Sequence, residues 1–193
     1  VTYVFDFCGG GAYSRSDWQD GMSLFTEQHD LESVAWELSR EPFVDQDNVF
    51  LCGSSLGATV TLMAARANAQ LVRGCVLLYP AFNLHDAVRQ ACPDRNSLPE
   101  AFPIMGMDVS GDFLRSCYDY DFFEHIPAFP EEVLLFHGDA DTAVPLSYSQ
   151  RAARLFPHCE LRVIRGGGHG FVGEQYWQVV EQAAEWLGAR MRR

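Results

Sequence analysis

The sequence predicts a single α/β domain built on a mostly parallel sheet with helices on both faces. Apolar runs of strand length alternate along the chain with segments whose apolar residues recur at helical spacing. This alternation is typical of β-α-β units, in which the strands lie parallel. The length points the same way, because 193 residues, 48% of them hydrophobic, are enough for one sizeable core and too few for two comfortable ones.

Each element is predicted from its local pattern, in chain order. Apolar runs of strand length predict strands at 1–7, 48–52, 74–80, 132–138 and 160–166. Apolar residues three or four apart predict helices at 29–39, 56–69, 147–156 and about 174–191. The first helix places Leu31, Val34, Ala35 and Leu38 on one face. The apolar stripe of the last consists of Trp177, Val180, Ala184, Leu187 and Met191.

Residues 82–130 interrupt this alternation with proline, glycine and many aromatic residues, and no strand is predicted there. An insertion between two strands on the carboxyl side of such a sheet would lie over the active-site edge, so we expect a small cap. Its large apolar residues either form the core of the cap, which is the favoured alternative, or line an acyl pocket. They are Phe102, Met105, Met107, Phe113, Tyr118, Tyr120, Phe122 and Phe123.

Composition excludes several classes of function. A formal net charge of −12 argues against nucleic acid as a partner, and no apolar run approaches the length of a membrane span. The six cysteines form no C-x-x-C pair, so we expect free thiols and a cytoplasmic location. His85 and Asp86 lack a third ligand at useful spacing, and we expect no metal or other cofactor.

The stretch CGSSLGA contains Gly53-x-Ser55-x-Gly57 between a predicted strand and a predicted helix. In this context G-x-S-x-G is typical of a strained turn that exposes a nucleophilic serine and needs small residues two positions away on either side. The backbone N–H of Leu56 would then face an oxyanion. The alternative is an ordinary strand-turn-helix junction in which Ser55 caps the helix.

A nucleophilic serine needs a base, and the base needs an orienting acid. His169 follows one predicted strand, and Asp139 and Asp141 follow another, so both carboxylates are candidates for the acid. All of these residues would meet at the carboxyl edge of the sheet. Because they occur in the order serine, aspartate, histidine, we expect a catalytic triad.

The chain resembles the α/β-hydrolase superfamily and, within it, small carboxylesterases related to cinnamoyl (feruloyl) esterases and serine aminopeptidase-like hydrolases. The resemblance spans nearly the whole chain and is carried by FDFCGGGAYSRS, LCGSSLGA, LLYPAF, HGDADTAVP and GGGHGF. It implies that the acid is Asp141, the fifth residue of HGDADTAVP, and that Asp139 is a neighbour. His137, in the same motif, is expected to pack or hydrogen-bond behind the acid loop.

The resemblance also implies a departure at the front of the chain. Members of the superfamily have further strands before the one that residues 1–7 resemble, and a His-Gly loop after the third supplies the second oxyanion N–H. We therefore expect this chain to be a C-terminal fragment lacking N-terminal strands, or one whose first strand pairs beside residues 48–52. The exposed strand 1–7 would then favour self-association. A second oxyanion donor within the chain would come from Gly9–Gly11.

The expected function is hydrolysis of small carboxylic esters through an acyl-enzyme, with Ser55, His169 and Asp141 as the triad. The cap and the resemblance favour medium or aromatic, cinnamoyl-like acyl groups. Peptidase or thioesterase activity uses the same triad and stays open. A non-catalytic module of the same fold, which binds a small ligand or a partner, is the remaining alternative because the His-Gly loop is absent.

Overall fold

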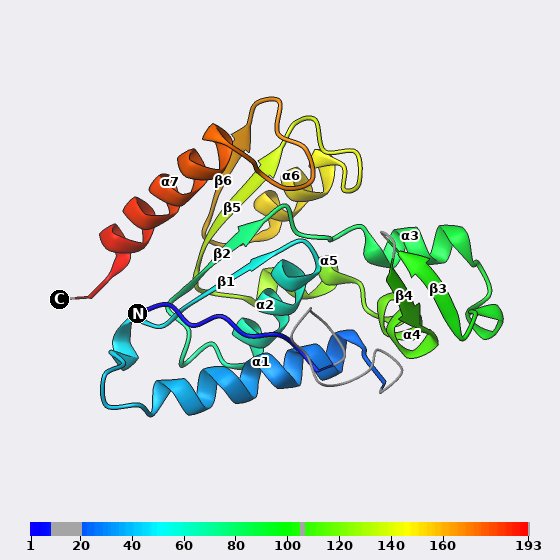
Figure 1. Cartoon of the computed structure of the whole chain (residues 1–193), viewed down its shortest axis with the longest axis horizontal. Helices are drawn as coiled ribbons and strands as arrows, with labels where there is room; N and C mark the ends of the chain where they lie inside the picture. Colours follow the sequence, from blue (N-terminus) through cyan, green and yellow to red (C-terminus); the bar gives the residue numbers. More distant parts are fainter. Residues whose placement is uncertain (9–20, 105–106, 193) are drawn as a thin grey trace. The chain divides into compact units, whose positions relative to one another are not determined.

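A computed structural model describes residues 1–8, 21–104 and 107–192 of the chain, with only the backbone of Met107 included (Figure 1). The chain divides into two compact units. One comprises Val1–Glu37 with Leu84–Asp121, and the other comprises Leu38–Asn83 with Phe122–Arg193. We call the second the sheet unit, because it holds the parallel sheet predicted from the sequence.

Among the described residues, the sheet has four parallel strands in the order β1-β2-β5-β6. The strands are β1 (Phe50–Ser54), β2 (Gly74–Leu78), β5 (Glu132–Gly138) and β6 (Cys159–Ile164). The unit's α-helices are α2 (Leu56–Ala67), α5 (Phe122–His125), α6 (Leu146–Leu155) and α7 (Glu174–Arg190), with short 3-10 turns η1 (Gln46–Asn48) and η3 (Ile126–Ala128). The predicted fold class is confirmed, and each predicted element of this unit is present within about two residues of its expected bounds.

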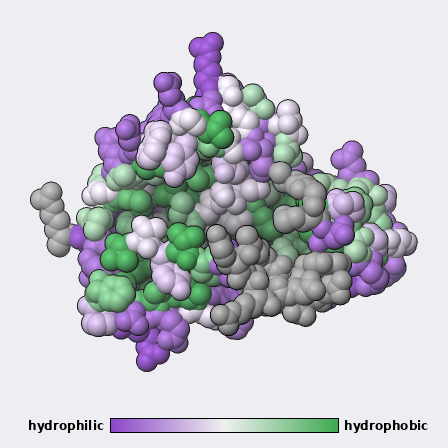
Figure 2. Space-filling view, viewed as in Figure 1, coloured by the Kyte–Doolittle hydropathy of each residue, from purple (hydrophilic) through white to green (hydrophobic). Residues whose placement is uncertain are grey.

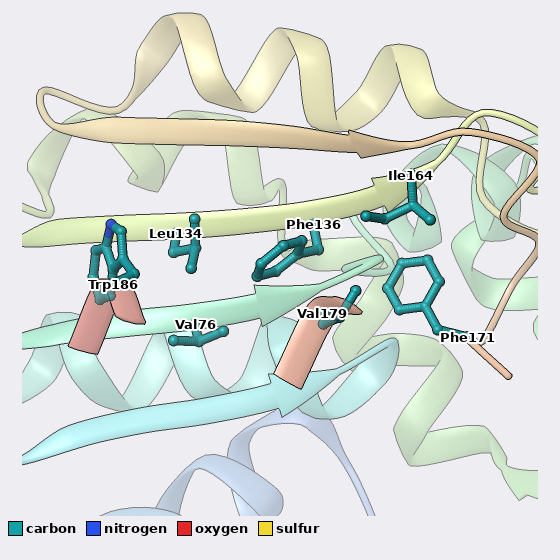
Figure 3. Close-up of a cluster of buried hydrophobic side chains, with 7 residues drawn as sticks. All are labelled: Val76, Leu134, Phe136, Ile164, Phe171, Val179 and Trp186. Carbon is teal, nitrogen blue, oxygen red and sulfur yellow. The ribbon is translucent and has the colours of Figure 1, made fainter. Parts of the chain in front are cut away.

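Helices cover both faces of the sheet, as the alternation along the strands shows. On β5, Leu134 and Phe136 pack against Trp186 of α7, while His137 hydrogen-bonds Ser149 of α6 on the opposite face. The α7 side forms a buried cluster of seven residues from both strands and helix (Figure 3). Its members are Val76, Leu134, Phe136, Ile164, Phe171, Val179 and Trp186. Because each buried side chain of this size contributes about 1.5–3 kcal/mol, the cluster holds α7 and the end of β6 in place.

The predicted apolar stripe of α7 is only partly its buried face, because Leu187 packs against the buried cluster whereas most of the stripe does not. Val179 and Trp186 are buried, whereas Trp177 is 63% exposed and Val180 39% exposed. The helix carries two apolar stripes, and packing selects the one that meets Leu134 and Phe136. Figure 2 shows hydrophobic surface on the side of the view where Figure 1 draws α7 and the sheet.

The other unit contains α1 (Leu24–Ser39), whose last two residues fall in the sheet unit, and the insertion between β2 and β5. The insertion holds α3 (Leu84–Ala91), η2 (Arg95–Ser97), β3 (Ala101–Ile104), β4 (Met107–Ser110) and α4 (Gly111–Asp119). The β3-β4 pair is antiparallel, so the expectation of no strand in this region is wrong. Two hydroxyls join α4 to the start of α1: Ser116 Oγ accepts from the Leu24 N–H at 3.0 Å, and Ser110 Oγ donates to the Met22 carbonyl at 2.9 Å.

The large apolar residues of 82–130 divide by burial. Phe113, Phe122 and Phe123 are buried, whereas Phe102 is 41% exposed. Met105 lies outside the described residues, and the side chain of Met107 does too. Phe113 is in the insertion, whereas Phe122 and Phe123 are in α5 of the sheet unit and their rings lie beside that of Phe82. The favoured alternative, in which these residues form the core of a cap, stays a prediction.

Residues 1–7 do not form the predicted strand. A strand needs a neighbour to pair with its backbone N–H and C=O groups, and no described strand pairs with this segment. Val1, Tyr3 and Val4 are exposed, and Cys8 N–H donates to the Asp30 carboxylate at 2.8 Å. Nor does the segment pair with β1, which has β2 as its one neighbour among the described strands. Self-association through this segment stays a prediction, now resting on exposed side chains and not on a strand edge.

All six cysteines are free thiols. Cys75 and Cys117 are buried, and none of the six cysteines is in a disulfide. Within the described ranges, we find no helix with the length and hydropathy required to cross a membrane.

Glu27 of α1 makes stability depend on pH. Its side chain is 3% exposed, and Oε2 has no hydrogen-bond partner among the described residues. Burial, with a smaller contribution from the charge of Asp30, raises the pKa of the carboxyl from 4.5 to about 7. The folded state therefore holds a proton that the unfolded chain releases, so stability falls as the pH rises from about 4.5 to about 7, by about 3 kcal/mol in total.

Replacement of Glu27 by glutamine removes this ionisation. We expect Glu27→Gln to be more stable than the wild type by up to about 3 kcal/mol at pH 8, with a much smaller difference near pH 4.5. Urea unfolding at the two pH values measures this. The exposed Glu37 on the same helix provides the control, since Glu37→Gln should change stability little at either pH. An equal gain for Glu27→Gln at both values would show that Glu27 does not titrate as described.

Candidate active site

Ser55 lies in a strained turn between β1 and α2. Its backbone has φ +52° and ψ −121°, in a region that residues with side chains rarely adopt. The Ser55 N–H donates to the Leu78 carbonyl at 2.9 Å, and the Ser55 carbonyl accepts from Ala81 N–H at 3.1 Å. These bonds tie the turn to the end of β2. Ser55 occupies the N-cap position of α2, but its side chain makes no cap hydrogen bond to the helix.

Gly53 and Gly57 lie two residues before and after Ser55, and contacts with described atoms exclude a larger side chain only at Gly53. A Cβ at Gly53 would lie 2.3 Å from the Gly57 carbonyl oxygen and 2.4 Å from Thr61 Oγ1, so no larger residue fits. A Cβ built at Gly57 would have no described atom within 4 Å outside its own helix backbone. The expectation that both positions must be small is therefore right for Gly53, and at Gly57 it stays a prediction.

His169 joins the serine to an acid through its two ring nitrogens. Nε2 lies 2.8 Å from Ser55 Oγ, and Nδ1 lies 2.9 Å from Asp141 Oδ2. Because a carboxylate only accepts, Nδ1 carries the proton in the neutral ring and Nε2 accepts from the serine hydroxyl. The structure thus brings the three residues predicted from the sequence into one hydrogen-bonded relay within the sheet unit.

Asp141 is held from both of its oxygens. Oδ1 accepts from the N–H groups of Ala143 and Val144, each at 2.9 Å, and the side chain is fully buried. Desolvation alone would raise the pKa of Asp141. The hydrogen bonds from Val144 and His169, and the attraction of the His169 ring, outweigh it and hold the pKa below its ordinary value. The carboxylate is therefore charged at neutral pH.

Asp139, the other candidate acid, occupies a different place. Its Oδ1 accepts from Gly166 N–H at 2.6 Å, and the next residue, Ala140, donates to the Gly167 carbonyl at 2.9 Å. Asp139 therefore ties the loop after β5 to the loop that carries His169. The assignment of the acid to Asp141, which the resemblance implied, agrees with this arrangement.

The loops that carry Asp141 and His169 touch at two glycines. A Cβ built at Gly138 would lie 2.1 Å from the Gly167 carbonyl oxygen, which is backbone and has no flexible side chain to move aside. Two further features hold the His169 loop: Gly166 adopts φ +68°, and Phe171 is buried in the cluster beneath α7. The distance between acid and base therefore depends on the close approach of Gly138 to Gly167.

Gly138→Ala tests this contact. The added methyl group must push the two loops apart, so we expect a loss of about 1–3 kcal/mol of unfolding free energy and slower turnover in any assay that depends on the relay. Gly188→Ala is the matched control, because Gly188 lies inside α7 with no described atom within 4 Å. There alanine should raise stability by up to about 1 kcal/mol. Thermal unfolding measures both variants. A change of the melting temperature in the same direction for both would contradict the close approach of Gly138 to Gly167.

Tyr79 was not predicted to be part of the site. It follows β2 with φ +37°, and its ring packs edge-on against His169 at 4.9 Å and against Phe171 at 5.1 Å between centroids. The Tyr79 N–H donates to the Phe136 carbonyl at 2.6 Å. The Tyr79 ring therefore packs against one side of the His169 imidazole. In the sequence, Tyr79 lies inside the strand predicted at 74–80 and in the motif LLYPAF, and neither was assigned a role in the site.

Leu56 is the first residue of α2, so its backbone N–H lies outside the hydrogen-bond ladder of the helix. This is the geometry expected of the first oxyanion donor, and its role stays a prediction. Gly9–Gly11, the expected source of a second donor, lies outside the described residues. The Nε2 atom of His85, which was considered as a metal ligand, lies 3.2 Å from Arg89 Nη1 on α3.

Comparison with known proteins shows the family of the chain and structures of the same fold. The model of the prolyl oligopeptidase family matches residues 1–192. None of the curated proteins matches the sequence. Among solved structures, Est1E from Butyrivibrio proteoclasticus with bound ferulic acid superposes with a TM-score of 0.85 at 21% identity, covering 96% of this chain and 75% of that one.

Two further structures show the same fold at similar identity. The monoacylglycerol lipase of Paleococcus ferrophilus has a TM-score of 0.71 at 20% identity, over 98% of this chain and 83% of that one. The esterase EaEST from Exiguobacterium antarcticum has a TM-score of 0.68 at 18% identity, over 95% and 80%. At these identities the likeness shows an α/β-hydrolase fold.

Proposed function

Because the chain belongs to the prolyl oligopeptidase family, we propose that it is a serine hydrolase that cleaves small carboxylic esters through an acyl-enzyme. The single observation that supports this most is the continuous relay from Ser55 Oγ through His169 to the charged Asp141. Each of the three residues follows a different strand of one parallel sheet, β1, β5 or β6. These strand ends share one edge, which is where substrates bind in open α/β sheets.

In the proposed mechanism, Ser55 Oγ attacks the ester carbonyl carbon while His169 Nε2 takes the hydroxyl proton. The tetrahedral oxyanion forms beside the Leu56 N–H at the start of α2. Collapse breaks the bond to the alcohol oxygen, which receives the proton from Nε2 and leaves as the free alcohol. A water molecule then repeats the sequence on the acyl-Ser55 ester, releasing the acid and restoring the serine.

Asp141 has two parts in this scheme. Its Oδ2 fixes the tautomer with hydrogen on Nδ1, so that Nε2 is free to accept the proton. Its negative charge stabilises the imidazolium that forms after proton transfer. The charge is available because the hydrogen bonds from Val144 and His169 keep the carboxyl ionised despite its burial.

We propose medium or aromatic acyl groups as substrates, cinnamoyl-like groups included. The likeness to a structure solved with ferulic acid supports this choice. A second candidate is hydrolysis of amides at the same site, which the family match favours through the relative for which the family is named. Both reactions would use the same three residues.

A substrate panel tests the proposal. Purified protein is assayed with phenylpropenoyl, acetyl and long-chain esters of one chromogenic alcohol, and with aminoacyl and prolyl amides of matched amines. We expect ester turnover with a preference for phenylpropenoyl over acetyl and long-chain esters. Faster cleavage of the amides would replace the esterase proposal with the second candidate.

A further inference from the structure

We propose that His137 is a positioning residue, which donates a hydrogen bond to Asp141 Oδ2 and so fixes that oxygen against His169. The inference rests on the proposed hydrolase function and adds to it a residue behind the acid. In the described residues, Oδ2 has two N–H neighbours, His169 Nδ1 at 2.9 Å and His137 Nε2 at 3.3 Å. One belongs to the proposed base, and the other belongs to the core.

His137 is a fully buried imidazole with polar partners on both ring nitrogens. It lies on β5, on the face opposite Phe136, and none of its side chain is exposed to solvent. Nε2 lies 2.9 Å from the Val144 carbonyl oxygen, and Nδ1 lies 2.7 Å from Ser149 Oγ. A buried imidazole paired at both nitrogens has one orientation open to it, because rotation would leave both without partners.

The partners determine which nitrogen of His137 carries the proton. The Val144 carbonyl and the Asp141 carboxylate can only accept, so Nε2 must be the N–H that points at both. Burial, which outweighs the opposing hydrogen bonds to Val144 and Asp141, holds the pKa of His137 below its ordinary value, so the ring is neutral. Nδ1 of a neutral ring then accepts, and the Ser149 hydroxyl donates to it.

Ser149 connects this arrangement to a rigid element. It is fully buried in α6, and its hydroxyl fixes the ring from the side away from Asp141. The order of donation is therefore Ser149 to His137, His137 to the Val144 carbonyl, and Val144 N–H back to Asp141 Oδ1. The same Nε2–H of His137 faces Asp141 Oδ2 at 3.3 Å. The carboxylate is enclosed by donors whose positions are set by β5, α6 and the loop between them.

The consequence concerns the moment of proton transfer. When His169 becomes an imidazolium and its Nε2–H turns toward the leaving alcohol, Oδ2 must stay in place so that it keeps the hydrogen bond from Nδ1–H. The bonds to Ala143 and Val144 hold only Oδ1 and permit the carboxylate to rotate about its axis. The His137 N–H holds Oδ2 as well. Loss of that donor should slow turnover without weakening substrate binding.

Two substitutions at one position separate positioning from packing. His137→Leu fills similar space with no donor, whereas His137→Gln keeps an N–H close to the place of Nε2. We expect His137→Leu to lower kcat about tenfold, the low end of the range for one hydrogen bond to a charged group, with KM changed less than about twofold. His137→Gln should recover most of the rate, to within about threefold of the wild type.

Ser149→Ala gives a second test if His137→Leu fails to fold. It removes the donor to Nδ1 and should lower kcat by about threefold with KM unchanged. Ser147→Ala, an exposed position in the same helix, should have wild-type rates. Circular dichroism and thermal unfolding of each variant confirm that the folded fraction is the same.

The outcomes distinguish this inference from the proposed function. An active wild type with equal rates for His137→Leu and His137→Gln overturns the positioning role and leaves the hydrolase proposal intact. Equal rates for Ser149→Ala and Ser147→Ala do the same if His137→Leu does not fold. A wild type that turns over neither esters nor amides overturns both proposals.

Discussion

Replacement of Ser55 by alanine is expected to lower kcat for ester hydrolysis by about 10⁴-fold or more. Ser55 Oγ is the atom that we propose forms the covalent bond, and it lies 2.8 Å from His169 Nε2, the proposed proton acceptor. Alanine leaves the bound substrate to react with water alone. The backbone should tolerate the change, because alanine removes a single oxygen from a turn whose hydrogen bonds come from the main chain.

Ser54 is the matched control for this substitution. It is the last residue of β1, adjacent to Ser55, and it is exposed. Ser54→Ala should keep the activity of the wild type. Steady-state rates with one activated ester measure both variants. Retention of more than about a tenth of the rate by Ser55→Ala would contradict a nucleophilic role.

Asp141→Asn is expected to lower kcat by about 10³- to 10⁴-fold, with a small effect on KM. Asparagine removes the charge that stabilises the imidazolium, and its amide can turn an N–H toward His169 Nδ1. The ring would then carry its proton on Nε2, where it can no longer accept from Ser55. Asp141 makes this bond at 2.9 Å from a side chain without solvent contact, so water cannot substitute for it.

Asp139→Asn is the comparison that separates the two carboxylates. Asparagine can still accept the hydrogen bond from Gly166 N–H through its carbonyl oxygen, so the His169 loop should stay in place. We expect its kcat to stay within about tenfold of the wild type. Purified variants assayed side by side decide the assignment. A larger loss for Asp139→Asn than for Asp141→Asn would reverse it.

The strand predicted most accurately is one that the sheet buries on both faces. The strand expected at 132–138 coincides with β5 at both ends, because the buried residues 133–137, apolar except for His137, lie between Glu132 and Gly138. Residues 1–7 have a similar composition, yet form no strand. A sequence shows that a segment can pair, and only the tertiary structure shows whether a partner lies beside it.

The same limit applies to helix faces and short hairpins. In α7, the stripes that contain Trp177 and Trp186 both have helical spacing, and only contact with Leu134 and Phe136 identifies the buried one. The β3-β4 hairpin was missed because its strands are four residues each, and one contains Pro103. Strands this short carry too few residues for a period to be recognised.

In the site, the residues that motifs mark were predicted to meet, and the structure places Ser55, Asp141 and His169 in hydrogen-bond contact. The residues around them were not assigned partners. Tyr79 adopts a positive φ and packs against His169, and the sequence pattern predicted neither feature. His137 was expected behind the acid loop, but its contact with Ser149 of α6 depends on helix packing. Supporting contacts of this kind arise between elements, where a linear pattern carries no signal.

The most direct test of the central claim, that Ser55 is a nucleophile activated by His169, is covalent labelling with a fluorophosphonate followed by peptide mass spectrometry. We predict one adduct, on Ser55, that is absent from Ser55→Ala, present in Ser54→Ala and formed much more slowly in Asp141→Asn. Absence of any adduct on the wild-type protein, or an adduct on a serine other than Ser55, would contradict the claim. Absence of any adduct would favour a non-catalytic module that retains the fold and binds a ligand or a partner at this edge of the sheet.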